Sequence, residues 1–244
     1  MVEFLAAAGI EYAWHTDVGR VRARNEDSVA VDAELGLLVV ADGMGGHNAG
    51  DVASRMAIEG VLAAMREGAA DDDQRLQHAV RRANDAIYAA AGDDFDRSGM
   101  GTTVVAAWLR PSGLIAAHVG DSRLYRLRDG ALEALTRDHT QVQDLVDRGI
   151  LTPAQARVSN RRNFLSRALG TYPDVDIDSA VHPHAPGDVY LLCSDGLTNM
   201  VEDEEIVAII GSSKSLGAAA ELLVAQANEY GGRDNITVAL ARLG

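Results

Sequence analysis

Three stretches with the pattern of β-strands follow one another directly in the middle of the chain. They cover residues 102–109, 114–119 and 122–127, and only a few residues separate each stretch from the next. A crossover between parallel strands needs a dozen or more residues, whereas a tight turn can join antiparallel strands. The middle of the chain therefore favours antiparallel pairing and argues against a repeated strand-helix-strand sheet.

Further strands and several helices extend this pattern. Strand-like runs lie at 11–16, 28–32, 36–41, 188–194 and 236–241, and helical spacing or propensity indicates helices at 49–66, 74–90, 203–210 and 216–230. Because helices arrive in pairs and strands in runs, we expect an α+β fold with antiparallel sheets covered by helices. Residues 140–170 mix short-helix and loop signals, with Pro153 as a helix start, and we expect a movable flap there.

The chain is acidic and carries no block of basic residues. Its 244 residues have a formal net charge of −14, which argues against a nucleic-acid or anionic-membrane partner. No apolar run approaches the ~18 to 20 residues that span a bilayer, and residues 1–10 lack the basic flank of a secretion signal. Cys193, the only cysteine, lies in the apolar run 189–193 and is expected to be a buried thiol. We expect one catalytic domain over residues 1–244, cytoplasmic and unanchored.

Acidic residues follow three of the predicted strands, each beside a glycine. Asp42, Asp121 and Asp195 stand where an apolar run stops. One such aspartate alone is more often part of a turn than of a site. Glu26 and Asp234 lie in two further acidic segments, and together the five residues predict carboxylates that meet at the mouth of a sheet.

Converging carboxylates indicate a metal site. They repel one another at neutral pH unless a cation lies among them, and Mg²⁺ and Mn²⁺ select oxygen ligands of this kind. Zinc fits less well, because the chain has no cysteine cluster and His182 and His184 flank Pro183 in an expected loop. We therefore predict a multinuclear Mg²⁺ or Mn²⁺ site.

Six motifs make the chain resemble the metal-dependent protein phosphatase family of the 2C type. They follow the order and approximate spacing of that family, and the resemblance covers about residues 16–237. None is decisive alone, but six in sequence with matching strand contexts are a specific signal. The glycine-rich second motif resembles the bacterial branch, whose members often oppose serine/threonine kinases. The motifs lie at residues 22–28, 42–47, 99–103, 120–123, 194–197 and 232–237.

The resemblance implies a four-layer αββα sandwich, in which helix pairs flank two antiparallel sheets. It also implies two tightly held Mn²⁺ or Mg²⁺ ions and a weaker third, with a shared water that attacks phosphorus in line. The implied ligands are Asp42, bridging the two ions; Glu26 and the carbonyl of Gly43 on one ion; Asp195 and Asp234 on the other; and Asp121, with help from Asp195, for the third.

Arg22 occupies the phosphate-binding position of the family, four residues before Glu26. Its planar guanidinium suits two phosphate oxygens, and the alternative is a surface ion pair. Eukaryotic relatives carry a histidine, proposed as general acid, where this chain has Met44, which cannot donate a proton. His47 is a candidate donor or a support for the ligands, but packing or capping at a helix start fits it equally well. The general acid stays unassigned.

Two segments, 138–140 and 162–170, resemble those that bracket the flap in the family, where contacts to the substrate peptide are expected. The alternative is structural, because their arginines can pair with nearby carboxylates. Thr102, Thr103 and Ser122 are expected to support the backbone or the ligands, because no histidine and aspartate accompany them as in a nucleophilic site. His118 is expected to be an ordinary structural or surface histidine.

These observations predict a metal-dependent phosphatase that acts on phosphoserine and phosphothreonine in proteins, a serine/threonine kinase among them. We expect a monomer. A pseudophosphatase that binds a phosphoprotein or senses metal is the alternative, although the complete carboxylate set and Arg22 argue against it. A third reading is another metallohydrolase, such as a nuclease or a small-molecule phosphatase. The net charge of −14 weakens the nuclease, and preference for a phosphopeptide would exclude the small-molecule enzyme.

Overall fold

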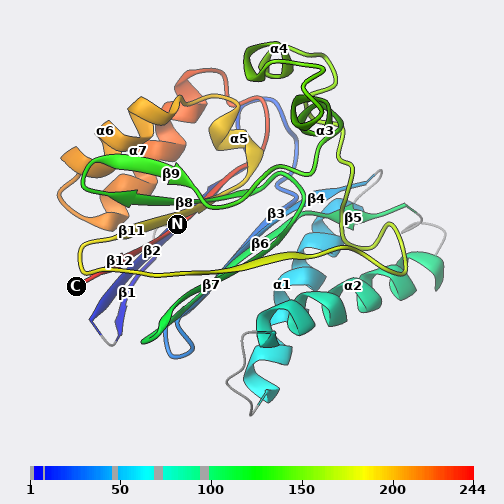
Figure 1. The fold of residues 1–244 in the computed structure, drawn as a ribbon, viewed down its shortest axis with the longest axis horizontal. Coiled ribbons are helices and arrows are strands. Elements are labelled where there is room, and N and C mark those ends of the chain that lie inside the picture. Colours follow the sequence, from blue (N-terminus) through cyan, green and yellow to red (C-terminus); the bar gives the residue numbers. More distant parts are fainter. Residues whose placement is uncertain (1–2, 8, 46–48, 69–73, 94–98) are drawn as a thin grey trace.

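The computed structural model describes residues 3–7, 9–45, 49–68, 74–93 and 99–244. In that part of the chain, antiparallel pairing builds two sheets that face each other (Figure 1). The first sheet has the order β1 (Glu3–Ala7), β2 (Ile10–Asp17), β12 (Ile236–Leu243), β11 (Val189–Cys193), β8 (Arg123–Arg128) and β9 (Ala131–Ala134). The second has the order β10 (Asp178–His182), β7 (Gly113–Val119), β6 (Val104–Arg110), β4 (Leu37–Met44) and β3 (Asp27–Asp32), and β5 (Gly101–Thr102) pairs with the end of β4.

A helix pair covers the outer face of each sheet, as Figure 1 shows. Helices α1 (Ala49–Glu67) and α2 (Arg75–Asp93) pack on the second sheet, and α6 (Asp203–Ser212) and α7 (Leu216–Glu229) lie on the side of the first. Alternate residues of the central strands enter different cores: Val39 packs towards α1 and α2, whereas Val40 faces the other sheet. The strands are therefore apolar on both faces, and the predicted four-layer αββα sandwich is confirmed.

The expected flap contains two short helices with clear start signals. The Thr140 side chain accepts the Gln143 N–H at the start of α3 (Gln141–Asp147). Thr152 and Gln155 form a reciprocal capping box at the start of α4 (Pro153–Arg157), so the predicted helix start at Pro153 is confirmed. This segment lies at the same end of the sandwich as α5 (Asp195–Thr198) (Figure 1). Movement of the flap stays a prediction.

Three strands, β1, β9 and β10, and one helix, α5, were not predicted from the sequence. β1, β9 and β10 lie at the ends of the two sheet orders, where a strand needs little apolar alternation. The residues of β10 are largely exposed, and His182 is its last residue, so the expected loop at that histidine is wrong. The run predicted to end at residue 41 continues as strand through Asp42 to Met44.

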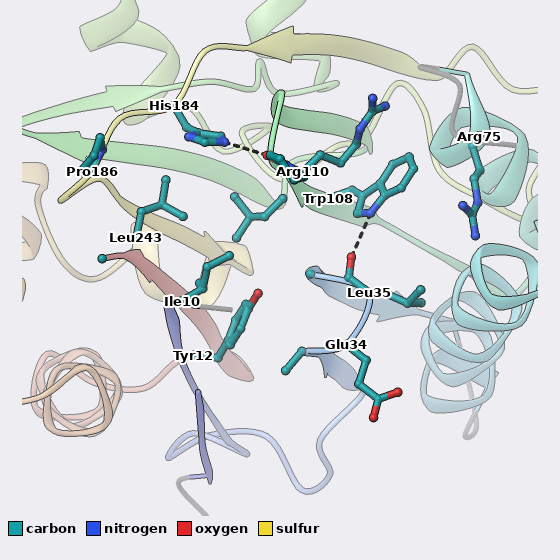
Figure 2. A pocket seen from close by; sticks show the side chains of 16 residues that line it. Ile10, Tyr12, Glu34, Leu35, Arg75, Trp108, Arg110, His184, Pro186 and Leu243 are labelled. Atoms are coloured by element: carbon teal, nitrogen blue, oxygen red, sulfur yellow. Dashed lines mark hydrogen bonds between the residues drawn. The ribbon is translucent and has the colours of Figure 1, made fainter. Parts of the chain in front are cut away.

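At one end of the sandwich, a mostly apolar cavity of about 600 Å³ separates the sheets (Figure 2). It is bordered by the β3–β4 and β6–β7 connections, so it lies at the opposite strand ends from Asp42. The Trp108 indole N–H donates to the Leu35 carbonyl (3.0 Å), and a ring N–H of His184 donates to the Arg110 carbonyl (2.7 Å).

Two expectations from composition can be compared with the structure. Cys193 is fully buried in β11, as predicted. Among the residues described, none of the helices combines the length and apolar composition that crossing a bilayer requires.

Candidate metal centre

A cleft of about 420 Å³ gathers the predicted site residues. It lies at the sandwich end where β4 finishes, α5 begins and the loop before β12 turns. Met44 and the flap residues Asn163, Phe164 and Leu165 also line it. His47 lies outside the described residues. The predicted residues that line the cleft are Arg22, Glu26, Asp42, Gly43, Asp121, Asp195 and Asp234.

Asp42 is held in place through its backbone. Its N–H donates to the Thr103 hydroxyl (2.9 Å), and its carbonyl accepts the Thr102 hydroxyl (2.9 Å). The Thr103 hydroxyl lies 2.7 Å from that of Ser122, next to Asp121 in sequence. These three hydroxyls therefore support the backbone around the carboxylates, as predicted.

Asn235 ties together two loops that are far apart in sequence. Its side-chain oxygen accepts the Glu26 N–H (2.8 Å), and its side-chain NH₂ donates to the carbonyls of Val18 (3.0 Å) and Arg24 (2.8 Å). The neighbouring Asp234 carboxylate accepts the Asn235 N–H (2.9 Å). One amide therefore sets the positions of Glu26 and Asp234 relative to each other.

Arg22 reaches into the cleft from the loop before β3. Its guanidinium donates to the second oxygen of Asp234 at 2.7 Å, and half of its side chain is exposed. Arg20 and Arg24 are also exposed. Arg22 thus makes an ion pair, and its partner is a predicted metal ligand. The ion-pair interpretation and the phosphate-binding interpretation of Arg22 are therefore compatible.

Two aspartates carry a buried oxygen that has no hydrogen-bond partner among the described residues. Asp195 accepts the Asn199 side-chain N–H on Oδ2 (2.9 Å), and its buried Oδ1 has no hydrogen-bond partner among the described residues. Asp27 accepts the Ser194 hydroxyl on Oδ2 (2.7 Å), and its Oδ1 is likewise unpartnered within the described part of the chain. Buried polar atoms are normally satisfied, so these oxygens fit a cation as their missing partner.

Asp27 is a site residue to which sequence reasoning gave no role. It lies directly opposite Asp42 in the β3–β4 ladder and is 8% exposed. Its place beside Glu26 in the first motif was the available signal, but only the strand pairing shows that it turns inwards towards Asp42.

Several carboxyl groups in and beside the cleft have raised pKa values. Burial, with neighbouring aspartates adding to it, raises the pKa of Asp42 and of Asp121 well above the usual range. The same causes, opposed in part by hydrogen bonds, raise the pKa of Asp27 to about 7 and of Asp195 to about 6. Each of these carboxyl groups is therefore harder to ionise than an exposed one, and positive charge in the cleft would favour the ionised forms.

The flap and α5 enclose a second space beside this cleft. A cavity of about 590 Å³ lies between α4 and α5, and Asp121 and Asp195 border both spaces. Arg162 and Asn163 line it from the flap, so this predicted flap segment does border the carboxylates. Its contact with a substrate peptide stays a prediction.

Comparison with known proteins places the chain in a family. The family model described as Protein phosphatase 2C matches residues 20–229. The serine/threonine phosphatase stp of Listeria innocua is 42% identical over 235 residues, which cover 93% of each chain. The serine/threonine protein phosphatase PstP of Mycobacterium tuberculosis is 43% identical over 239 residues, 95% of this chain and 45% of that protein.

Solved structures agree with this result. The crystal structure of the Mycobacterium tuberculosis serine/threonine phosphatase PstP/Ppp has a TM-score of 0.88 and 41% identity, covering 96% of this chain and 98% of the other. The PstP catalytic domain in complex with two manganese ions has a TM-score of 0.87, 41% identity and coverage of 96% and 97%. The chain belongs to the protein phosphatase 2C family, and the predicted resemblance is confirmed.

Proposed function

We propose that this protein phosphatase hydrolyses phosphoserine and phosphothreonine monoesters with Mn²⁺ or Mg²⁺ held in the carboxylate cleft. The observation that carries the proposal is that Arg22 lines one cleft with five acidic side chains, of which Asp195 has a buried oxygen without a partner among the described residues. Relatives named serine/threonine phosphatases, one of them solved with two manganese ions, support it. They give no support to the pseudophosphatase.

The ligands that we propose are those implied by the resemblance. The ions would supply positive charge that offsets the charge of the phosphate and lowers the pKa of the attacking water. The raised pKa values of Asp42 and Asp121 and the orphaned oxygen of Asp195 support these assignments. Asp42 would contribute to two sites, Glu26 and the Gly43 carbonyl would complete one, Asp195 and Asp234 would complete the other, and Asp121 with Asp195 would hold a weaker third.

Arg22 and a cation compete for Asp234. The Arg22 guanidinium pairs with this carboxylate at 2.7 Å. If Asp234 held a cation instead, Arg22 would be available to bind two phosphate oxygens. Met44 cannot serve as the general acid, so the proton donor remains unassigned.

The proposal extends to substrates and context. The cavity between α4 and α5 offers a phosphoprotein segment a place beside the cleft. Serine/threonine kinases are proposed among the substrates, because the second motif resembles the bacterial branch. We propose that residues 1–244 act as one catalytic domain, monomeric and in the cytoplasm.

The test is phosphate release from a phosphothreonine peptide, with Mn²⁺ and with chelator. Wild type should release phosphate only with metal, and Asp234→Asn should lose the activity. Asp85→Asn, an exposed aspartate of α2, is the matched control and should behave as wild type. No release by folded, metal-loaded wild type would contradict the proposal. Equal or better hydrolysis of free phosphate esters would instead favour a small-molecule phosphatase.

A further inference from the structure

A buried pair of histidines lies just outside the carboxylate cleft. His118 on β7 and His139, after β9, stack with ring centroids 4.6 Å apart and an angle of 21° between their planes. Only 6% and 5% of these residues are exposed. Asp178 of β10 pairs with His118 across the ladder and places Oδ2 3.3 Å from Nε2 of His139. Arg167, at the end of the flap, donates to the other oxygen of Asp178 (2.8 Å).

The hydrogen bonds of His139 decide what this cluster does. His118, His139 and Asp178 offer ligand atoms within 4.8 Å of one another, close enough to suggest a cation. However, the Gly120 N–H donates to Nδ1 of His139 (3.1 Å), so Nδ1 carries no proton. The Arg167 guanidinium also lies 3.3 Å from Nε2. A neutral ring keeps one proton, however, and because Nδ1 accepts from Gly120 that proton is on Nε2, where it faces Asp178. A cation on Nε2 would require a ring with no proton at all, so the cluster is a hydrogen-bond relay.

This relay is hydrogen-bonded to the backbone of Gly120, the residue before Asp121. The backbone N–H of His139 donates to the Gly120 carbonyl (2.9 Å), and the ring Nδ1 accepts the Gly120 N–H. His139 therefore binds both backbone polar groups of Gly120. Gly120 has a φ of +106°, and a Cβ there would lie 2.6 Å from Cγ2 of Thr103. Its backbone is therefore confined on one side by Thr103 and on the other by His139, and Asp121 follows directly.

We propose that His139 is a positioning residue that fixes the Asp121 carboxylate in the cleft by accepting the Gly120 N–H on Nδ1. Asp178 accepts the Nε2 proton and so keeps the ring in the required tautomer. The Ser166 N–H donates to the His139 carbonyl (2.8 Å), which links the same residue to the end of the flap. The role rests on the proposed function, in which Asp121 holds the weaker third cation.

Two substitutions separate the two ring nitrogens. In His139→Asn, the side-chain oxygen can take the place of Nδ1 and still accept the Gly120 N–H. In His139→Gln, the amide reaches the place of Nε2 and the acceptor for Gly120 is lost. His184→Gln is the matched control, because it makes the same substitution at a histidine whose ring also bonds a backbone group, the Arg110 carbonyl, but in the cavity at the opposite end of the sandwich (Figure 2).

The first readout needs neither metal nor activity. Amide hydrogen exchange at Gly120 in chelator should be about tenfold faster in His139→Gln than in wild type, because a buried hydrogen bond is lost. His139→Asn and His184→Gln should keep the protection of wild type. Equal protection of Gly120 in wild type and His139→Gln would overturn the proposal.

The second readout is the Mn²⁺ titration of phosphopeptide hydrolysis. His139→Gln should need about tenfold more Mn²⁺ for half-maximal rate, because one buried hydrogen bond positions the ligand, and Asp121→Asn should show an increase in the same direction. Combining the two substitutions should add little to Asp121→Asn alone. A wild-type titration in folded His139→Gln would contradict the role.

The remaining outcomes are also informative. If His139→Gln does not fold, His139→Asn decides, because a raised Mn²⁺ requirement with the Gly120 acceptor retained would refute the proposal. If wild type hydrolyses no phosphopeptide, the proposed function fails. The exchange measurement still tests the hydrogen bond between the Gly120 N–H and the His139 ring.

Discussion

Asp27 and Asp42 face each other across β3 and β4. Burial, with Asp195 and Asp234 adding to it, raises the pKa of Asp27 to about 7. The folded protein therefore keeps a proton on Asp27 at a pH where the unfolded chain has already lost it. A carboxyl group whose pKa is raised in the folded state destabilises the protein least at low pH. The free energy of unfolding should therefore fall as pH rises from about 4 to 7.

This predicts a pH-dependent effect of Asp27→Asn, which cannot ionise. In chelator, the variant and wild type should unfold alike near pH 4, and the variant should be more stable by at least about 1 kcal/mol near pH 8. Urea unfolding at both pH values measures this. Asp85→Asn, on an exposed face, should show no such difference. A wild type that gains stability relative to Asp27→Asn as pH rises would refute the assignment.

Arg22 should affect substrate and metal in opposite directions. Arg22→Met removes a charged hydrogen-bond donor to phosphate, so KM for a phosphopeptide should rise about tenfold or more. It also removes the partner of Asp234, so less Mn²⁺ should be needed for half-maximal rate. Steady-state kinetics across a Mn²⁺ series measures both. An Arg22 that served only as a surface ion pair would leave KM unchanged.

At the scale of elements, the contact of α5 with the loop before β12 places Asp195 beside Asp234. A Cβ on Gly196 would overlap the Asn235 carbonyl oxygen, so Gly196→Ala must push α5 away from that loop. We expect a loss of about 1–3 kcal/mol of stability. A weaker response to Mn²⁺ should accompany this loss.

The matched control is a glycine in another helix. A Cβ on Gly211, near the end of α6, would meet no atom within 4 Å. Gly211→Ala should therefore add up to about 1 kcal/mol, because alanine favours the helix. Denaturant unfolding compares the two variants. If both changes had the same sign, the close approach at Gly196 would not explain the result.

The parts of the fold that the sequence predicts are those with two buried faces or a long apolar stripe. β4, β6 and β7 are nearly continuous apolar runs, and α1 repeats apolar residues at helical spacing. β9 and β10 escape prediction because they are exposed at sheet edges, and α5 is too short to show a period.

The residues of the candidate site also differ in whether the sequence pattern predicts them. Asp42, Asp121 and Asp195 can be recognised because each follows an apolar run and adjoins a glycine. Asp27 and His139 act through partners that lie elsewhere in the sequence. Asp27 faces Asp42 across a ladder, and His139 meets Gly120 from beyond two strands. Such pairings depend on register and loop path, which residue patterns do not specify.

At the scale of the whole molecule, the cleft concentrates the acidity of a chain with net charge −14. Cations that bind only the folded protein stabilise it, by about 2.7 kcal/mol for one site at one hundred times its dissociation constant. For a chain of this size, Tm should rise by roughly 5–10 °C in Mn²⁺ relative to chelator.

Scanning calorimetry tests this expectation, with Asp42→Asn as the variant that removes the carboxylate proposed to bridge the ions. The rise should largely disappear in the variant. A rise of the same size in Asp42→Asn would mean that the ions act elsewhere on the acidic surface.

The order of the first sheet also affects how the protein is made. β12 lies between β2 and β11, and the hydroxyls of Thr16 and Thr237 meet at 2.7 Å across 221 positions of sequence. While the ribosome is still synthesising β12, β2 and β11 each present an unpaired edge to other nascent chains. Chaperone protection therefore matters most between the emergence of β11 and that of β12. A chain whose translation stalls in that interval should aggregate, although almost all of its catalytic residues are already present.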